Sequence, residues 1–259
     1  MTVLRLDRYE ELLDASGDHV VVRLDVGRGV RLPAFAVSGP AGRAVVFARR
    51  SDHGVPGAAA LGDAAGLDTL FGEPVVRDWF RHSGARHLSA PRQHQHVVAR
   101  HLELGDRGGD WDWLVTTSAP PVLPGEDRVV GLTPDAREEA EAFLVAESPR
   151  THGQPFARPG QEWVAVRDGA GALLAVGGAE PSEAGTPTLA GIAVARRARR
   201  AGLGAAVTAT LTRRAVAARG ACALGVFADN PAAIGMYHRL GFTTGMRWRS
   251  RWLPDPDGT

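Results

Sequence analysis

The chain has 259 residues, of which 44% are hydrophobic, and its formal net charge is +1. This is enough apolar material for one large domain or two medium ones, and the charge gives no reason to expect nonspecific nucleic-acid binding. All 30 basic residues are arginine, which excludes a Schiff-base lysine and a P-loop lysine. The single cysteine, Cys222, excludes an internal disulfide and a thiolate metal cluster, and its apolar surroundings predict a small buried core residue.

No apolar run approaches the length that crosses a bilayer. Residues 1–7 also lack the apolar core of a signal peptide. We therefore expect a cytoplasmic protein that does not bind membranes.

The composition along the chain divides it into three segments. A proline-rich stretch at residues 119–126 predicts a stiff linker between an N-terminal lobe, residues 1–118, and a C-terminal domain, residues 127–259. In the N-terminal lobe we expect helices over residues 7–15, 75–82 and 94–104, and strands over residues 19–26, 34–37, 44–48 and 111–117.

The C-terminal segment alternates apolar runs with helical patterns, which predicts a mixed sheet with helices on both faces. Thr133 is the expected cap of its first helix, and the last residues, 254–259, are expected to fray. We expect strands over residues 128–132, 163–166, 173–176, 189–194, 224–228 and 243–253, and helices over residues 135–145, 202–218 and 231–240.

A glycine-rich turn follows the predicted strand at 189–194 and opens the predicted helix at 202–218. Gly202 and Gly204 let the backbone approach a ligand, and the first helical turn leaves N–H groups unpaired. The helix dipole and nearby guanidinium groups favour bound negative charge. The turn therefore predicts a diphosphate site.

Four arginines crowd the same turn: Arg196, Arg197, Arg199 and Arg200. A solvated charge run or a nucleic-acid patch remains an alternative explanation. Their position between a strand and a glycine-rich helix start favours phosphate binding.

A second motif follows the predicted strand at 224–228. Asp229 or Asn230 caps a helix that has Pro231 in its first turn and Gly241 as its stop signal. Asn230 and Tyr237 are seven residues apart, so they lie on one helix face.

Because they contain both motifs, residues 127–255 resemble the GNAT superfamily of acyl-CoA-dependent N-acyltransferases. The signature Val-x-x-x-x-Arg/Gln-x-x-Gly-x-Gly/Ala reads here as Val194, Arg199, Gly202 and Gly204. The second signature, Asn-x-x-Ala-x-x-x-Tyr-x-x-x-Gly-Phe, reads as Asn230, Ala233, Tyr237, Gly241 and Phe242. Two linked motifs in the family's order are far more specific than either alone.

The resemblance implies direct transfer of an acyl group, expected to be acetyl, from acetyl-CoA to an amine. The Val194 N–H would polarise the thioester carbonyl, and Tyr237 would protonate the departing thiolate. Asn230 would hydrogen-bond the pantetheine arm, whose amides would pair with the strand edge. The expected cofactor-binding residues are Ile192, Ala193, Val194, Arg199, Arg200, Ala201, Gly202, Leu203, Gly204, Ala205, Asn230 and Ala233.

Family members often carry a carboxylate base on the fourth or fifth strand, where this chain has Thr188 and Gly225. Glu180 and Glu183 follow the third predicted strand and would act through water, with Glu180 the preferred candidate. A water chain alone, or an exposed loop role for Glu180, are the alternatives.

An internal repeat relates the two parts of the chain. Shifting the C-terminal motifs back by 136 residues places Arg199 on Asp63 and Gly204 on Asp68, and it places Tyr237 on His101. Carboxylates then stand where a diphosphate would bind. The N-terminal lobe is therefore expected to be a degenerate acyltransferase-like copy that holds no coenzyme A, and the fold to be an α/β (α+β) tandem of GNAT-like mixed β-sheets flanked by helices.

The histidines of the N-terminal lobe do not predict a metal site. His94 and His96 do not share a helix face, and no carboxylate set completes the ligands. Solvated or cleft-lining roles fit them better. The tryptophans are expected to be strand and core aromatics; those considered are Trp111, Trp113, Trp163, Trp248 and Trp252.

Two classes of function fit these features. The first is an N-acetyltransferase whose acceptor is a small-molecule or peptide amine, such as an amino acid, an aminated antibiotic or a protein N-terminus. The second is a non-catalytic acyl-CoA-binding regulatory module, favoured by the missing carboxylate. An O-acyltransferase is a third alternative. No metal, nucleic acid or membrane is expected as a partner, and the oligomeric state is not predicted.

Overall fold

The computed structural model describes residues 2–40, 42–51 and 54–254. They form two compact units that interleave along the chain. Unit 1 comprises Met1–Asp112, Phe227–Asp229 and Gly245–Thr259, and unit 2 comprises Trp113–Val226 and Asn230–Thr244. Strands β6 (Gly108–Thr116) and β12 (Thr243–Trp252) contribute to both units. The domain boundaries at 118 and 127 stay a prediction, but residues 245–254 cluster with unit 1 and not with the predicted C-terminal domain.

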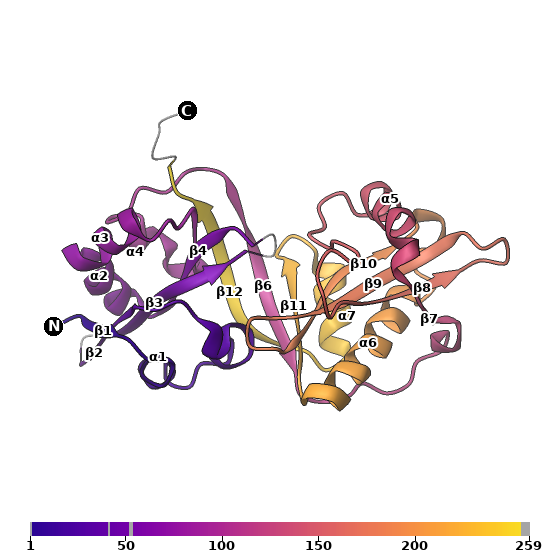
Figure 1. The fold of residues 1–259 in the computed structure, drawn as a ribbon, viewed down its shortest axis with the longest axis horizontal. Helices are drawn as coiled ribbons and strands as arrows, with labels where there is room; N and C mark the ends of the chain where they lie inside the picture. Colours follow the sequence, from indigo (N-terminus) through magenta and orange to yellow (C-terminus); the bar gives the residue numbers. More distant parts are fainter. Residues whose placement is uncertain (1, 41, 52–53, 255–259) are drawn as a thin grey trace. The chain divides into compact units, whose positions relative to one another are not determined.

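In unit 1 a mixed sheet has the strand order β1-β2-β3-β4-β5-β12. Helices α2, α3 and α4 bury one continuous apolar cluster against it, while α1 packs on β2 and β3 (Figure 1). The bounds are β1 Leu4–Leu6, α1 Tyr9–Ser16, β2 Ala34–Gly39, β3 Gly42–Arg50, β4 Pro56–Gly62, α2 Ala64–Gly72, α3 Pro74–His82, β5 His87–Pro91 and α4 Gln95–Val98.

In unit 2 the strand order is β11-β10-β9-β8-β7. Helices α6 and α7 cover one face of this sheet and α5 covers the other, each over its own apolar cluster. This is the mixed sheet with helices on both faces that the sequence predicts. The bounds are β7 Val130–Gly131, α5 Arg137–Glu147, β8 Glu162–Arg167, β9 Leu173–Pro181, β10 Pro187–Val194, α6 Leu203–Arg219, β11 Cys222–Phe227 and α7 Pro231–Arg239.

The two units share one topology. In unit 1, β2, β3 and β4 pair antiparallel, and β4 then pairs parallel with β5 across α2. In unit 2, β8, β9 and β10 pair antiparallel, and β10 pairs parallel with β11 across α6. The internal repeat is therefore structural. Its offset is not constant, because the caps Asp63 and Gly202 are 139 residues apart and not 136.

Two predicted elements of the N-terminal part are wrong. Residues 22–26 form a turn of π-helix and not a strand, because Val22 and Val26, four residues apart, bury the same helical face. The predicted helix at 94–104 is reduced to the four residues of α4. Beyond it the chain turns, and the His101 ring bonds the Asp68 carboxylate at 2.8 Å. Strands β4 and β5 and helix α2 were not predicted at all.

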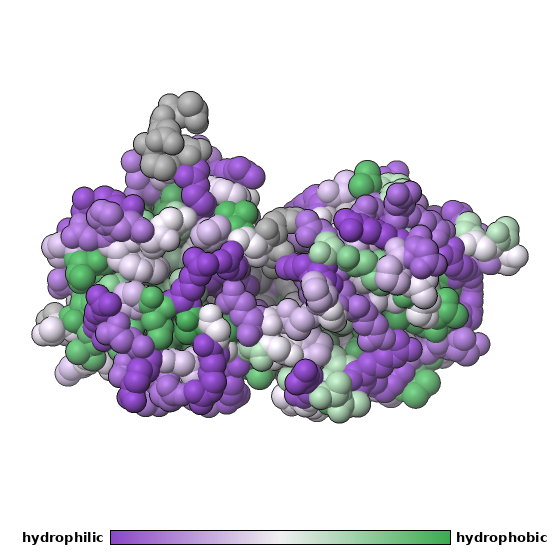
Figure 2. Space-filling model, viewed as in Figure 1, coloured by the Kyte–Doolittle hydropathy of each residue, from purple (hydrophilic) through white to green (hydrophobic). Residues whose placement is uncertain are grey.

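The two units differ little in the polarity of their visible surface: hydrophilic residues dominate on both, and apolar residues show only in small groups (Figure 2). Among the described residues, no helix is long and apolar enough to span a bilayer. Trp113, Trp163 and Trp248 are buried, as predicted for core aromatics.

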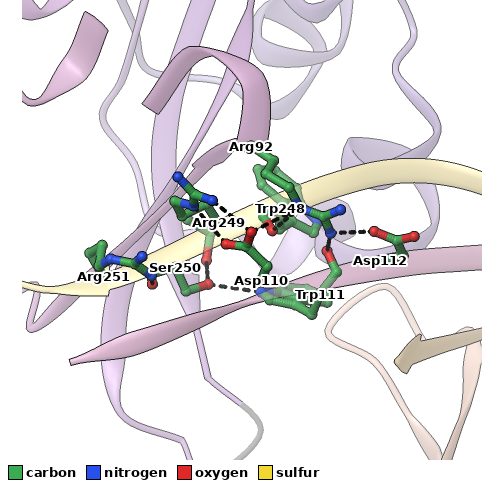
Figure 3. Close-up of polar contacts among 9 residues, drawn as sticks. Arg92, Asp110, Trp111, Asp112, Trp248, Arg249, Ser250 and Arg251 are labelled. Atoms are coloured by element: carbon green, nitrogen blue, oxygen red, sulfur yellow. Dashed lines mark hydrogen bonds and ion pairs between the residues drawn. The ribbon is translucent and has the colours of Figure 1, made fainter. Parts of the chain in front are cut away.

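A charged network joins β6, β12 and the turn after β5 within unit 1 (Figure 3). Arg249 binds Asp110 through two hydrogen bonds of 2.6 and 2.7 Å, and Arg92 binds Asp112 and the Trp111 carbonyl. Beside them the Trp111 and Trp248 rings stack at 6.0 Å. Arg92 and Arg249 each pair with a carboxylate of β6, Asp112 or Asp110, so these ion pairs link β6 to β12 and to the turn after β5.

Candidate functional site

Strand β10 contains a β-bulge that changes the direction of its backbone hydrogen-bonding groups. Its pairing with β9 shifts between Ala190 and Ala193, and Gly191 at this bulge has φ +65°. Only glycine adopts this backbone without strain. A Cβ here would also lie 2.6 Å from the Trp163 ring, which packs against the bulge.

Beyond the bulge, β10 has an open edge. It pairs with β11 only at Thr188 and Leu189, so the edge that faces β11 is unpaired towards Val194. The Ala195 N–H bonds the Leu174 carbonyl of β9. Because N–H groups alternate sides along a strand, the Val194 N–H points to the open edge. The predicted oxyanion donor is thus exposed on the side where a ligand can pair.

The turn from β10 to α6 presents a row of backbone amides. Arg200 and Gly202 both have positive φ, +70° and +79°, which folds the chain sharply into the helix. No atom lies within 4 Å of the Cβ that Gly202 lacks, so the space beside the turn is open. Within the described residues, the N–H groups of residues 200–205 have no acceptor, since a helix leaves its first amides unpaired. The turn can therefore receive an anion.

Acidic residues outside the motif hold this turn. The Arg196 N–H bonds the Glu147 carboxylate at 2.9 Å, and Arg197 pairs with Asp168 at 3.0 Å. Arg199 donates to the Val194 carbonyl at 3.2 Å and to the Glu147 carbonyl at 3.1 Å. Sequence reasoning missed Glu147 and Asp168, because nothing in their local pattern ties them to the turn. Three of the four arginines therefore have structural partners, and Arg199 also braces the strand.

Helix α7 brings the second motif to the same apolar cluster. Asn230 caps the helix by accepting the Ala233 N–H at 3.2 Å, as predicted for the helix start. Tyr237 is buried and packs edge-on against Phe242 at 5.9 Å. Burial raises the pKa of Tyr237 to about 12, so the phenol stays protonated near neutral pH. Ile192, Val194, Leu203, Ala233 and Tyr237 share this one cluster.

Glu180 stands apart from that cluster. It lies inside β9, not after it, opposite Thr188 at the start of β10. Arg158 and Gln161 both donate to its Oε2, at 2.6 and 2.7 Å, while Oε1 has no partner among the described residues. The structure thus places Glu180 at the other end of β10 from Val194, with one oxygen available.

The matching position in unit 1 is closed. Helix α2 begins directly after β4, with Asp63 as its cap and no intervening loop. The Asp63 carboxylate accepts the Gly66 N–H at 2.8 Å and the Arg43 N–H at 2.9 Å. These hydrogen bonds lower the pKa of Asp63, the one from Gly66 most. The protein's own carboxylate therefore occupies the place of an anion.

No three metal-ligating side chains cluster anywhere in the part of the chain that the structure describes. Cys222 is buried in β11, and burial raises the pKa of its thiol to about 12. The predicted core role of Cys222 is confirmed.

Comparison with known proteins agrees with this geometry. Residues 130–242 match the sequence model of the Acetyltransferase (GNAT) family. No relative was found among curated proteins. Three solved structures are similar to this chain. A putative GNAT acetyltransferase from Novosphingobium aromaticivorans is 18% identical with a TM-score of 0.53, and the match covers 95% of this chain and 96% of that chain. A GCN5-related N-acetyltransferase from Kribbella flavida is 18% identical with a TM-score of 0.54, covering 96% of both chains, and a GNAT-family acetyltransferase from Colwellia psychrerythraea is 16% identical with a TM-score of 0.53, covering 98% of this chain and 100% of that chain.

These structures show the fold, and each covers nearly the whole of this chain. The repeated strand–helix–strand core of unit 1 fits a tandem arrangement in which the first copy has lost its anion-binding turn. Residues 130–242 are therefore similar in sequence to the acetyltransferase (GNAT) family, and unit 1 repeats the strand pairing of unit 2.

Proposed function

We propose that unit 2 transfers an acetyl group from acetyl-CoA to an amine. The observation that carries the proposal is the meeting of three features: the open edge of β10, the unpaired amides that begin α6, and a buried tyrosine beside both. The amides from Arg200 to Ala205 hold the diphosphate. The pantetheine arm adds to the edge of β10 as an extra strand, between Ile192 and Val194.

The chemistry then follows from the positions of two groups. The amine nitrogen attacks the thioester carbon, and the Val194 N–H stabilises the oxyanion that forms. The carbon–sulfur bond breaks, and the departing thiolate takes the proton of the Tyr237 hydroxyl. Solvent or the proton released by the amine restores the phenol.

The transfer requires that the pKa values of donor and acceptor approach each other. A thiol in water has a pKa of about 8.5, and burial raises the pKa of Tyr237 to about 12. Desolvation also raises the pKa of a thiol, as it does for Cys222 in the same unit. Exclusion of water by the bound ligand would therefore bring the pKa of the leaving thiol closer to that of the Tyr237 phenol.

Glu180 is the proposed base, acting through water from its free Oε1. Arg158 and Gln161 fix its other oxygen, so the carboxylate keeps one orientation. Thr188, which faces it across the strands, supplies no carboxylate of its own.

Two measurements test the proposal. Calorimetric titration with acetyl-CoA should show saturable binding, and S-acetylpantetheine, which lacks the diphosphate, should bind at least tenfold more weakly. Release of free thiol should follow when a panel of amines is added, and Glu180→Gln should lower the rate of release. No heat with either ligand would overturn the assignment.

The second candidate is a non-catalytic acyl-CoA-binding module. It is favoured by the engagement of Glu180 with Arg158 and by the absence of a carboxylate at Thr188 and Gly225. Tight binding of acetyl-CoA without thiol release on any amine would support it. Release on a panel of alcohols alone would instead indicate an O-acyltransferase.

A further inference from the structure

Unit 1 contains a cavity of about 210 Å³ where its own parallel strands part. Strands β4 and β5 pair only around Ala58 and Ala59, and the cavity lies towards their carboxyl ends, lined by Leu61, Gly62 and Pro91. Ligands of open α/β sheets bind at such divergent strand ends. The degenerate unit has therefore kept a cleft although it has lost the anion-binding turn.

The cavity cannot take a ligand that needs a diphosphate cradle. Asp63 fills the start of α2, and the backbone of Arg43 closes it further. A Cβ on Gly66 would lie 2.4 Å from the Arg43 carbonyl carbon, so no room is left between strand and helix. The volume is also below the roughly 300–1,000 Å³ of pockets that hold drug-sized ligands. The occupant must be small.

Four polar side chains belong to the lining: Ser16, His19, Arg43 and Gln93. The Ser16 hydroxyl already donates to the Leu13 carbonyl, and Arg43 and His19 offer further donors. Arg43 lines the cavity, and its guanidinium reaches to the end of α1 beside Gly17. No carboxylate pairs with it among the described residues, because Asp63 accepts only backbone N–H groups. The Nδ1 of His19 accepts the Val21 N–H, which leaves Nε2 to carry the proton and to donate.

The rest of the lining is mainly apolar, with Ala15, Val45, Leu61 and Met246 among its members. The exposed Arg43 and the His19 imidazole N–H therefore line a cavity whose other members are mainly apolar, a combination that suits a carboxylate with a short hydrocarbon chain. The lining carries no acidic side chain that would attract an amine instead.

We propose that this cavity binds a small aliphatic monocarboxylate, with Arg43 and His19 holding the carboxylate group. The site lies wholly within unit 1 and is independent of the acyl-CoA site proposed for unit 2. It gives the degenerate copy a ligand of its own, of a different class from coenzyme A.

The test is calorimetric titration of the full chain with butyrate, using butanol and butylamine as isosteric probes without the negative charge. Butyrate should bind saturably and the other two should not. Arg43→Gln should weaken butyrate binding at least tenfold. His19→Asn, whose side-chain oxygen can still accept the Val21 N–H, should weaken it by about threefold, or roughly 0.7 kcal/mol.

Three controls separate this site from the rest of the molecule. Arg31→Gln removes an exposed arginine of the same unit that does not line the cavity, and it should leave butyrate binding unchanged. Gly202→Asp, aimed at the coenzyme turn of unit 2, should also leave it unchanged. Ala15→Phe should fill the cavity and abolish binding. Absence of binding, equal binding of butyrate and butanol, or wild-type affinity in Arg43→Gln would each overturn the proposal.

Discussion

Helices α2 and α6 hold the same place in the two units, yet the first turn of α6 is open to a ligand and that of α2 is closed. Each follows the first strand of a parallel pair. Helix α6 is separated from β10 by residues 195–202, and its first amides remain free. Helix α2 follows β4 after one residue, Asp63, whose carboxylate takes two backbone N–H groups. A helix start attracts anions in either case, and what differs is whether the chain supplies its own.

This contrast shows how a ligand site is lost without loss of the fold. The sheet order and the helix cover are kept in unit 1, but shortening one loop and adding one carboxylate close the site. Close packing also keeps the start of α2 closed to a ligand. Backbone atoms of neighbouring residues lie directly against Gly42, Gly62 and Gly66 and leave no room there. The following predictions test how far the contrast holds.

The largest effect is expected at Tyr237. The 136-residue shift places it on His101, which is bound to Asp68, whereas the Tyr237 hydroxyl has no hydrogen-bond partner among the described residues. Tyr237→Phe should lower kcat by about 10²–10⁴, the range for loss of a general acid, with little change in KM. His101→Phe should leave kcat unchanged. Equal kcat values for Tyr237→Phe and the wild type, in a thiol-release assay, would remove Tyr237 from the mechanism.

Unit 2 should also respond to alkaline pH. Burial raises the pKa of Tyr237 from 10.0 and that of Cys222 from 9.0, each to about 12. Their stabilising contribution is complete below the unfolded pKa and is lost as pH rises towards 12. The free energy of unfolding should therefore fall by about 2–4 kcal/mol per group between pH 9 and 12.

Denaturant titration across this pH range measures the loss, and Tyr237→Phe should show a shallower slope than the wild type. The chain has two tyrosines, so a tyrosinate absorbance titration can follow Tyr237 directly. Ionisation of both tyrosines near pH 10 would contradict the burial argument.

The contrast between the helix starts can be transferred by one substitution. Gly202→Asp gives α6 the cap residue of α2, and its carboxylate should weaken acetyl-CoA binding at least tenfold, or about 1.4 kcal/mol. Gly202→Asn has the same shape and the same strain at φ +79° but no charge. Calorimetry on both variants isolates the charge; equal affinities would mean that the diphosphate lies elsewhere.

The smallest effect is expected at the cap of α2 itself. Asp63→Ala should lower the free energy of unfolding by about 1 kcal/mol, as for other N-cap deletions. Because its pKa is lowered, this contribution is present at neutral pH and is lost as pH falls below the ordinary value of 3.8. The variant should not acquire coenzyme A binding, since no loop is gained. Coenzyme binding by Asp63→Ala would show that the carboxylate alone blocks the site.

Much of unit 2 could be predicted because its signals are local. Pro231, Asn230 and Gly241 mark the ends of α7, and the alternating apolar runs mark β8 to β11. Unit 1 was harder. Strand β4, Pro-Gly-Ala-Ala-Ala-Leu-Gly, has little β-propensity and is a strand only because the sheet buries it. The valine-rich turn at 22–26 shows the reverse error, because tertiary packing overrides propensity there.

In the candidate site, sequence could place the motif residues but not their surroundings. The closeness of Val194, Leu203 and Tyr237 followed from the family pattern, and all three share one apolar cluster. Glu147 and Asp168 come from other elements, so only the fold brings them to the turn. The bulge at Gly191 left a trace in the sequence, a glycine inside an apolar strand, that could have been used.

The indole of Trp163 gives the bulge of β10 a rigid support. The ring occupies the space that side chains at Gly178 and Gly191 would need, so strands β9 and β10 both pack on the same aromatic surface. The direction of the Val194 amide is consequently set during folding and not by an arriving ligand. The proposed thioester would meet a preorganised dipole there and incur no cost for rearranging the strand.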